Sequence, residues 1–161
     1  MKKLFCLSVI ISLCCTFCFG QNDPNKIDSI GYIQDSLKSK NIDPKNLSPI
    51  EGKAIVYIVR PTVFGFAVRQ EITCDNYLIG STKGKQYLYT VLSPGKHIFR
   101  AASENISKFE LTLEAGKIYF LKQEVKMGLV VAGTALELLS EDDGRKFLSR
   151  CKLAKENTFS N

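Results

Sequence analysis

The chain has 161 residues, of which 45% are hydrophobic and 24% are charged, and its formal net charge is +6 at pH 7. The basic residues are spread along the chain without a run of five like charges, which argues against a nucleic-acid-binding protein. This length and hydrophobic content are sufficient for one globular domain with its own core.

The first twenty residues carry a targeting pattern. Two lysines precede an uncharged apolar run over residues 4–19, and Gly20 follows it directly before the chain becomes polar. A basic start, a short apolar stretch and a small residue at the junction are typical of a secretory signal peptide, whereas a transmembrane helix needs about 20 apolar residues. We therefore predict a signal peptide at residues 1–20 and an exported protein, periplasmic or associated with the cell envelope, without a transmembrane span after cleavage.

Three cysteines near the end of the apolar run raise the question of a lipid anchor. They are Cys14, Cys15 and Cys18. Lipidated bacterial cysteines usually follow small residues, whereas Leu13 and Phe17 are bulky. We therefore expect no lipid anchor.

Residues 21–52 form a polar segment with three prolines and scattered hydrophobic residues. Asp23 followed by Pro24 is typical of a helix start, so we expect a short helix there and a linker after it. We interpret the segment as an N-terminal arm in front of a domain at residues 53–155, which a frayed tail at 156–161 would follow.

The domain is predicted to consist of short strands separated by turns. Residues 54–59 are apolar on both alternating faces, which is typical of a central strand covered on both sides. Asp75-Asn76 is a turn pair, and Ser93-Pro94-Gly95 places glycine where a type II turn requires positive φ. Further strands are expected at residues 68–74, 77–79, 86–91, 97–102, 109–113 and 117–126, and the apolar stretch 127–136 is interpreted as a core strand with glycine breaks.

A C-terminal helix is predicted from Ser140 onward. Ser140 is a favourable N-cap, and the three acidic residues that follow it complement the helix dipole. Phe147, Leu148, Cys151 and Ala154 would share the face that docks on a sheet. The whole pattern predicts a mainly β fold, an antiparallel β-sandwich of about 6–8 strands with a C-terminal α-helix packed on it.

Several of these turns and strands occur in an order that resembles a known family. The motifs are Lys53-Ala-Ile-Val-Tyr-Ile-Val-Arg-Pro61, Asp75-Asn-Tyr-Leu-Ile-Gly80, Pro94-Gly-Lys-His97, Leu111-Thr-Leu-Glu-Ala-Gly-Lys-Ile-Tyr119 and Gln123-Glu-Val-Lys-Met-Gly128. This set resembles the bacterial envelope family called domain of unknown function 2846, over about residues 53–140. Asn76 stands where the family usually has glycine, and asparagine also tolerates left-handed geometry. The resemblance implies a signal-bearing envelope protein with a β-rich domain, and it brings no activity or catalytic residues.

His97 is the one histidine of the chain, so any histidine-dependent chemistry rests on it. It follows a turn at the start of a predicted strand, where we expect a residue at the surface or rim. Because no nucleophile elbow accompanies it, a hydrolase that uses His97 ranks last among our functional hypotheses. We expect no enzyme, no catalytic or cofactor-binding residues and no metal site, since a metal would have to combine His97 with distant carboxylates.

Cys74 and Cys151 are the two cysteines that remain after signal cleavage. In an oxidising compartment they could form one disulfide, which would stabilise the fold by about 4 kcal/mol in the chain-entropy model. Alternatively, they are two separately buried thiols, because free cysteine behaves as a small hydrophobe. We favour the second interpretation, and both stay open at this stage.

Phe64 and Phe66 flank Gly65 just after the first predicted strand, and exposed aromatics there would form a contact surface. We therefore expect a non-enzymatic, exported β-sandwich module that binds an unknown envelope protein or glycan. The alternative is a carrier for small molecules or glycans with a pocket between its sheets.

Overall fold

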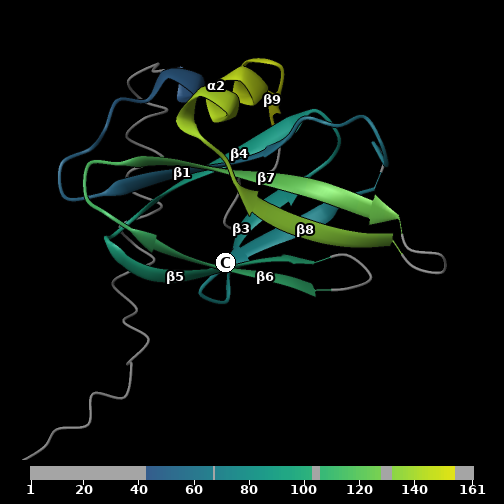
Figure 1. Ribbon diagram of the computed structural model, residues 1–161, viewed down its shortest axis with the longest axis horizontal. Coiled ribbons are helices and arrows are strands. Elements are labelled where there is room, and N and C mark those ends of the chain that lie inside the picture. Colours follow the sequence, from purple (N-terminus) through teal and green to yellow (C-terminus); the bar gives the residue numbers. More distant parts are fainter. Residues whose placement is uncertain (1–42, 67, 103–105, 128–131, 155–161) are drawn as a thin grey trace, which may run out of the picture.

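The computed structural model describes residues 43–66, 68–102, 106–127 and 132–154, and they form two β-sheets with a helix on one outer face (Figure 1). The elements in chain order are η1 (Pro44–Asn46), β1 (Ala54–Arg60), β2 (Gln70–Cys74), β3 (Tyr77–Thr82), β4 (Gln86–Leu92), β5 (Gly95–Ala102), β6 (Ile106–Leu113), β7 (Ile118–Met127), β8 (Ala132–Leu138), α2 (Glu141–Ser149) and β9 (Lys152–Leu153). The predicted mainly β sandwich with a C-terminal helix is confirmed.

The first sheet has the order β8-β7-β1-β4-β9, and the second has the order β3-β2-β5-β6. All pairs in the second sheet are antiparallel. In the first sheet, β1 is antiparallel to β4 but parallel to β7, and β4 is parallel to β9. Parallel neighbours need a long connection between them, and here the chain between β1 and β7 supplies the entire second sheet.

Strand β1 is the centre of the fold, and all seven of its residues are buried. Ala54, Val56 and Ile58 belong to the hydrophobic cluster between the sheets. Ile55, Tyr57 and Val59 point the other way, into a second cluster that includes Leu148 of α2. The prediction of a central strand covered on both sides is therefore confirmed, and the sandwich has a third layer over this strand.

The C-terminal helix begins as predicted but ends earlier. The Ser140 hydroxyl accepts a hydrogen bond from the Asp143 N–H at 3.2 Å, which caps the helix. The helix stops at Ser149, and Lys152–Leu153 becomes the edge strand β9 beside β4. The N–H of Lys152 and the N–H of Ala154 donate to carbonyls of β4 and its preceding turn, at 3.0 Å each. Pairing with an otherwise open sheet edge thus replaces the last helical turn.

Part of the predicted arm lies against the domain. Leu47 is 5% exposed and belongs to the second hydrophobic cluster, and Lys45 Nζ donates to the Ser149 carbonyl at 3.3 Å. The signal peptide predicted for residues 1–20, the helix start at Asp23 and the tail at 156–161 lie outside the described residues. Of the apolar stretch 127–136, residues 128–131 also lie outside them, and the parts on either side belong to the antiparallel pair β7–β8. Among the described helices, none is long and apolar enough to cross a membrane.

A cluster of aromatic rings lies beneath α2. Tyr57 stacks on Phe120 with ring centroids 5.2 Å apart, and Tyr87 and Tyr89 lie 6.3 and 6.2 Å from Tyr57. The Tyr57 hydroxyl donates to the Pro44 carbonyl at 2.8 Å, which attaches the segment before β1 to the domain. Burial raises the pKa of Tyr57 to about 12, and it also raises the pKa values of Tyr87 and Tyr89.

We expect Tyr57→Phe to flatten the loss of stability at high pH. An unfolded tyrosine ionises near its ordinary pKa of 10.0, whereas folded Tyr57 keeps its proton up to about 12. Because the unfolded chain releases this proton at a lower pH than the folded protein, wild type loses about 2–3 kcal/mol of stability as the pH rises from about 10 to about 12. Urea unfolding at about pH 8 should show the variant about 1 kcal/mol less stable, because the bond to Pro44 is gone. Between that pH and about pH 11 the variant should lose less stability than wild type, and an equal loss would contradict the assignment.

Candidate functional site

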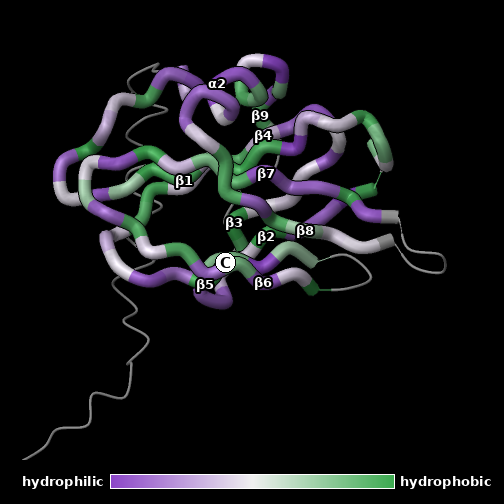
Figure 2. The backbone as a smooth tube through the Cα atoms, in the orientation of Figure 1, coloured by the Kyte–Doolittle hydropathy of each residue, from purple (hydrophilic) through white to green (hydrophobic). Residues whose placement is uncertain are grey.

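The connection between β1 and β2 exposes four large apolar side chains, which we call the aromatic loop. They are Val63, Phe64, Phe66 and Val68, with exposed fractions of 54, 52, 67 and 44%. Figure 2 shows part of this connection as a green, hydrophobic stretch at the end of the sandwich where β7 ends and β8 begins. Exposed apolar side chains gathered in this way are typical of an interaction site.

A buried arginine holds the aromatic loop in place. The Arg60 side chain is 0% exposed, and its guanidinium donates to the carbonyls of Val68 and Gly65 at 2.8 Å each and of Thr82 at 3.2 Å. Burial lowers the pKa of Arg60, but a guanidinium stays charged in proteins. One cation therefore connects the loop to the adjacent end of β3. Its hydrogen bonds replace those that the carbonyl groups would otherwise make with water.

The β3–β4 turn supports the loop from a second direction. The Gly84 N–H donates to the Phe66 carbonyl at 3.2 Å. A Cβ at Gly84 would lie 2.8 Å from the Thr62 carbonyl oxygen and 2.9 Å from the Phe66 Cα, closer than real Cβ atoms approach such neighbours. This close backbone contact requires glycine, and it fixes the loop on the turn that carries Lys83 and Lys85.

A polar network lies in the core behind Arg60. Thr82 Oγ1 donates to Gln123 Oε1 at 2.5 Å, and Gln123 Nε2 donates to Gln70 Oε1 at 2.9 Å. Thr134 Oγ1 also donates to Gln70 Oε1, at 3.3 Å. These buried side chains come from β2, β3, β7 and β8, so the network joins the two sheets at the end that carries the aromatic loop. Shared hydrogen bonds of this kind favour one relative placement of the sheets.

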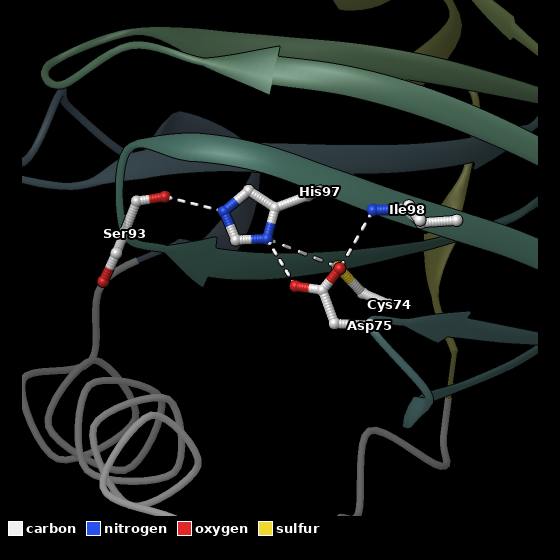
Figure 3. A network of polar contacts seen from close by, with 5 residues as sticks. All are labelled: Cys74, Asp75, Ser93, His97 and Ile98. Atoms are coloured by element: carbon white, nitrogen blue, oxygen red, sulfur yellow. Dashed lines mark hydrogen bonds and ion pairs between the residues drawn. The ribbon is translucent and has the colours of Figure 1, made fainter. Parts of the chain in front are cut away.

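A separate cluster contains Cys74, Asp75 and His97, shown in Figure 3. His97 Nδ1 lies 2.7 Å from Asp75 Oδ2 and 3.9 Å from Cys74 Sγ. His97 Nε2 lies 2.9 Å from the Ser93 carbonyl oxygen, and Asp75 Oδ1 accepts a hydrogen bond from the Ile98 N–H at 2.9 Å. The cluster thus connects the turn after β2 to both sides of the turn before β5.

His97 does not lie at the rim, as the sequence suggested, but is 1% exposed. The reason is the pairing of β5 with β2 on one side and β6 on the other. Cys74 lies opposite Phe99, and alternate residues of a strand share a face, so His97 and Phe99 lie on the same face as Cys74. The sandwich interior covers that face.

The cluster lacks the geometry of a nucleophilic triad. In such triads, the nucleophile and the acid contact opposite ring nitrogens of the histidine. Here Cys74 and Asp75 both face Nδ1, while Nε2 is used by a backbone carbonyl. The Ser93 hydroxyl instead accepts a hydrogen bond from Lys53 Nζ at 3.1 Å. The arrangement therefore suits anchoring or coordination at Nδ1 better than proton relay.

The two cysteines of the domain lie in different clusters. Cys74 belongs to the core between the sheets, and Cys151 belongs to the cluster beneath α2. Both are buried and neither forms a disulfide. Burial raises the pKa of the Cys151 thiol, which lowers its reactivity.

A surface cleft of about 270 Å³ lies between η1 and α2, lined by Lys45, Asn46, Arg145, Leu148 and Ser149. It is on the outer face of the first sheet and not between the sheets. Its arginine is already paired with Glu141, with Arg145 Nε at 2.8 Å from the carboxylate. The cleft therefore differs in place and chemistry from the pocket that a carrier of the predicted kind would have.

Comparison with known proteins places these features in a family. A family model described as a protein of unknown function, DUF2846, matches residues 50–135. An uncharacterized protein of Haemophilus influenzae is 31% identical over 120 residues, which cover 74% of this chain and 71% of the relative. The chain belongs to the DUF2846 family. The matched range contains the aromatic loop and the Cys74–Asp75–His97 cluster and ends before α2.

Two motifs on which the resemblance to DUF2846 rested meet in the structure. Asp75 opens one motif and His97 closes another, and their side chains contact each other at 2.7 Å. Sequence reasoning treated both as turn residues and did not connect them. The one available signal was that Asp75 directly follows one predicted strand and His97 begins another. Nothing in the sequence shows that these two strands, which are not consecutive, lie side by side.

Arg60 was also missed as a positioning residue. In the sequence it stands out only as a residue of the Lys53–Pro61 motif, and nothing in its neighbours along the chain marks it as buried. Its carbonyl partners lie 5, 8 and 22 residues away. Only the return of the chain through β2 and β3 brings them together.

Proposed function

We propose that the protein is a non-enzymatic, exported module that binds a protein of the cell envelope through its aromatic loop. The observation that carries this proposal is the exposure of Val63, Phe64, Phe66 and Val68 on a loop held by the buried Arg60. Export is inferred from the signal-peptide pattern of residues 1–20.

The loop is suited to binding because its shape is set before a partner arrives. Arg60 and the Gly84 contact fix the backbone from two directions. Fixing a loop in the free protein reduces the entropy lost on association, so more of the apolar burial contributes to affinity. Aromatic side chains in such positions commonly supply much of the binding energy of an interface.

The charges near the loop indicate the chemistry of the partner surface. Residues 60–70 and 82–86 contain no acidic residue, and Lys83 and Lys85 are exposed on the turn that contacts the loop. The four loop side chains offer no hydrogen-bonding group of the kind a glycan would require. An apolar pocket with an acidic rim on a protein therefore matches this surface best.

Site-specific photocrosslinking tests the proposal. A photoreactive phenylalanine analogue at Phe66 should yield one discrete adduct with an envelope protein, and Phe64→Ser in the same chain should reduce that adduct at least several-fold. The matched control is the same analogue at Ile106, because Ile106 and Phe66 are both 67% exposed. Identical products from positions 66 and 106 would refute a specific loop contact. Adducts with phospholipid alone would show that the loop contacts a membrane surface and not a protein.

A further inference from the structure

Three side chains with metal-binding atoms converge on one point in the second sheet. His97 Nδ1, Asp75 Oδ2 and Cys74 Sγ all lie within 4.8 Å of one another. We propose that Cys74, Asp75 and His97 form a Zn²⁺ site, independent of the binding surface at the aromatic loop. This inference departs from the sequence-based expectation of no metal site.

The directions of the three groups fit a coordination site. Cys74 and Asp75 approach the same ring nitrogen of His97 from neighbouring positions, as Figure 3 shows. A tetrahedral Zn²⁺ ion separates a ligand nitrogen from a ligand sulfur by about 3.6 Å and from a ligand oxygen by about 3.3 Å. The observed separations are 3.9 Å for sulfur and 2.7 Å for oxygen. Zinc geometry would change these two distances by about 0.3 and about 0.6 Å, and would bring sulfur and oxygen, here within 4.8 Å of each other, to about 3.6 Å.

Two hydrogen bonds orient the ligands for this role. His97 Nε2 lies 2.9 Å from the Ser93 carbonyl, an oxygen that only accepts, so Nε2 carries a proton and donates. In the free protein a proton bridges Nδ1 and Asp75 Oδ2, which lie 2.7 Å apart, and a bound Zn²⁺ would displace that proton and take the Nδ1 electron pair. The Ile98 N–H holds Asp75 Oδ1 at 2.9 Å and leaves Oδ2 directed at the ring. Backbone contacts of this kind commonly fix metal ligands in place.

The donor set favours Zn²⁺ among common biological cations. One thiolate, one imidazole and one carboxylate form a mixed set that Zn²⁺ accepts. Mg²⁺ and Ca²⁺ prefer oxygen ligands alone, and Cu⁺ prefers sulfur. Cys74 is 4% exposed and His97 is 1% exposed, whereas the Asp75 side chain is 28% exposed. An ion would therefore enter from the side of Asp75, where water would complete its coordination.

Cobalt absorption tests the site, because a thiolate bound to Co²⁺ produces a charge-transfer band in the near ultraviolet. Purified protein titrated with Co²⁺ should show this band at one ion per chain, and Zn²⁺ should displace it. Cys74→Ser should abolish the band and weaken Zn²⁺ binding at least about tenfold. Cys151→Ser removes the other buried thiol, which lies in the cluster beneath α2, and should leave both readouts unchanged.

Circular dichroism of each variant shows whether it is folded. The titration of the wild type tests the site without any substitution. Asp75→Asn should also weaken Zn²⁺ binding at least about tenfold while keeping the thiolate band. Absence of stoichiometric Co²⁺ and Zn²⁺ binding by the folded wild type would overturn the proposal. Persistence of the band in Cys74→Ser would overturn it as well. The contacts around His97 would then serve only as a hydrogen-bonded connection between two turns.

Discussion

Gly144→Ala is expected to lower the free energy of unfolding by about 3 kcal/mol, near the upper end of the cost of overpacking a core. An added Cβ at this position would lie 2.1 Å from Cγ of Phe120 and 2.5 Å from its Cβ. Phe120 cannot move aside freely, because it is 1% exposed and stacks on Tyr57. The helix would have to lift from the first sheet. Alanine would otherwise stabilise a helix interior by about 1 kcal/mol relative to glycine. A loss of stability would therefore show that the clash with Phe120 outweighs helix propensity.

Urea unfolding followed by circular dichroism measures this change. Lys146→Ala is the matched control, because Lys146 is an exposed residue of the same helix. It should change stability by no more than about 0.5 kcal/mol. A Gly144→Ala variant as stable as wild type would show that α2 does not lie directly on Phe120.

Arg60→Met is expected to destabilise the protein by about 3 kcal/mol and to release the aromatic loop. The substitution keeps an unbranched apolar stem but leaves the carbonyls of Gly65, Val68 and Thr82 without their donor. Buried acceptors that lose their partner cost about 1–3 kcal/mol each, and water that enters as the loop opens will offset part of this. Limited proteolysis should therefore show faster cleavage next to Phe64 and Phe66.

Arg145→Met is the control for this substitution, because the Arg145 side chain is 45% exposed and forms an ion pair with Glu141. Pairs of that kind contribute at most about 1 kcal/mol. Arg60→Lys should recover part of the stability but not the loop, since a single ammonium lacks the planar fork that reaches three carbonyls. Unchanged proteolysis in Arg60→Met would show that the loop is held by other contacts. It would also remove one support for the proposed binding surface.

The turns were the features most open to prediction. Asp75 and Asn76 have φ values of 50° and 74°, so the expectation that Asn76 tolerates left-handed geometry is confirmed. Gly95 has positive φ as predicted, at 131°, but it is the first residue of β5 and does not form the centre of the predicted type II turn. These conformations depend on side chains within two or three residues, and such information is present in any short stretch of sequence.

Less of the candidate sites could be predicted. Phe64 and Phe66 were singled out as a possible contact surface; the structure exposes both, and their role in binding stays a prediction. The order of the strands in the first sheet was not foreseen, because alternating apolar residues indicate a strand without specifying its neighbours. Arg60 is buried although arginine is mostly exposed in folded proteins, and only its carbonyl partners explain this burial.

Local chemistry along the chain was enough to determine the β-rich class, the corners at Asp75-Asn76 and Pro94-Gly95, and the helix cap at Ser140. Each of these depends on residues that are neighbours in sequence. The tertiary structure alone decided that β1 lies parallel to β7, and that Cys74 and Asp75 meet His97 across more than twenty residues. Contacts of that range arise when whole sheets pack to bury their apolar faces, and this packing is set by the sum of many side chains and by no single motif.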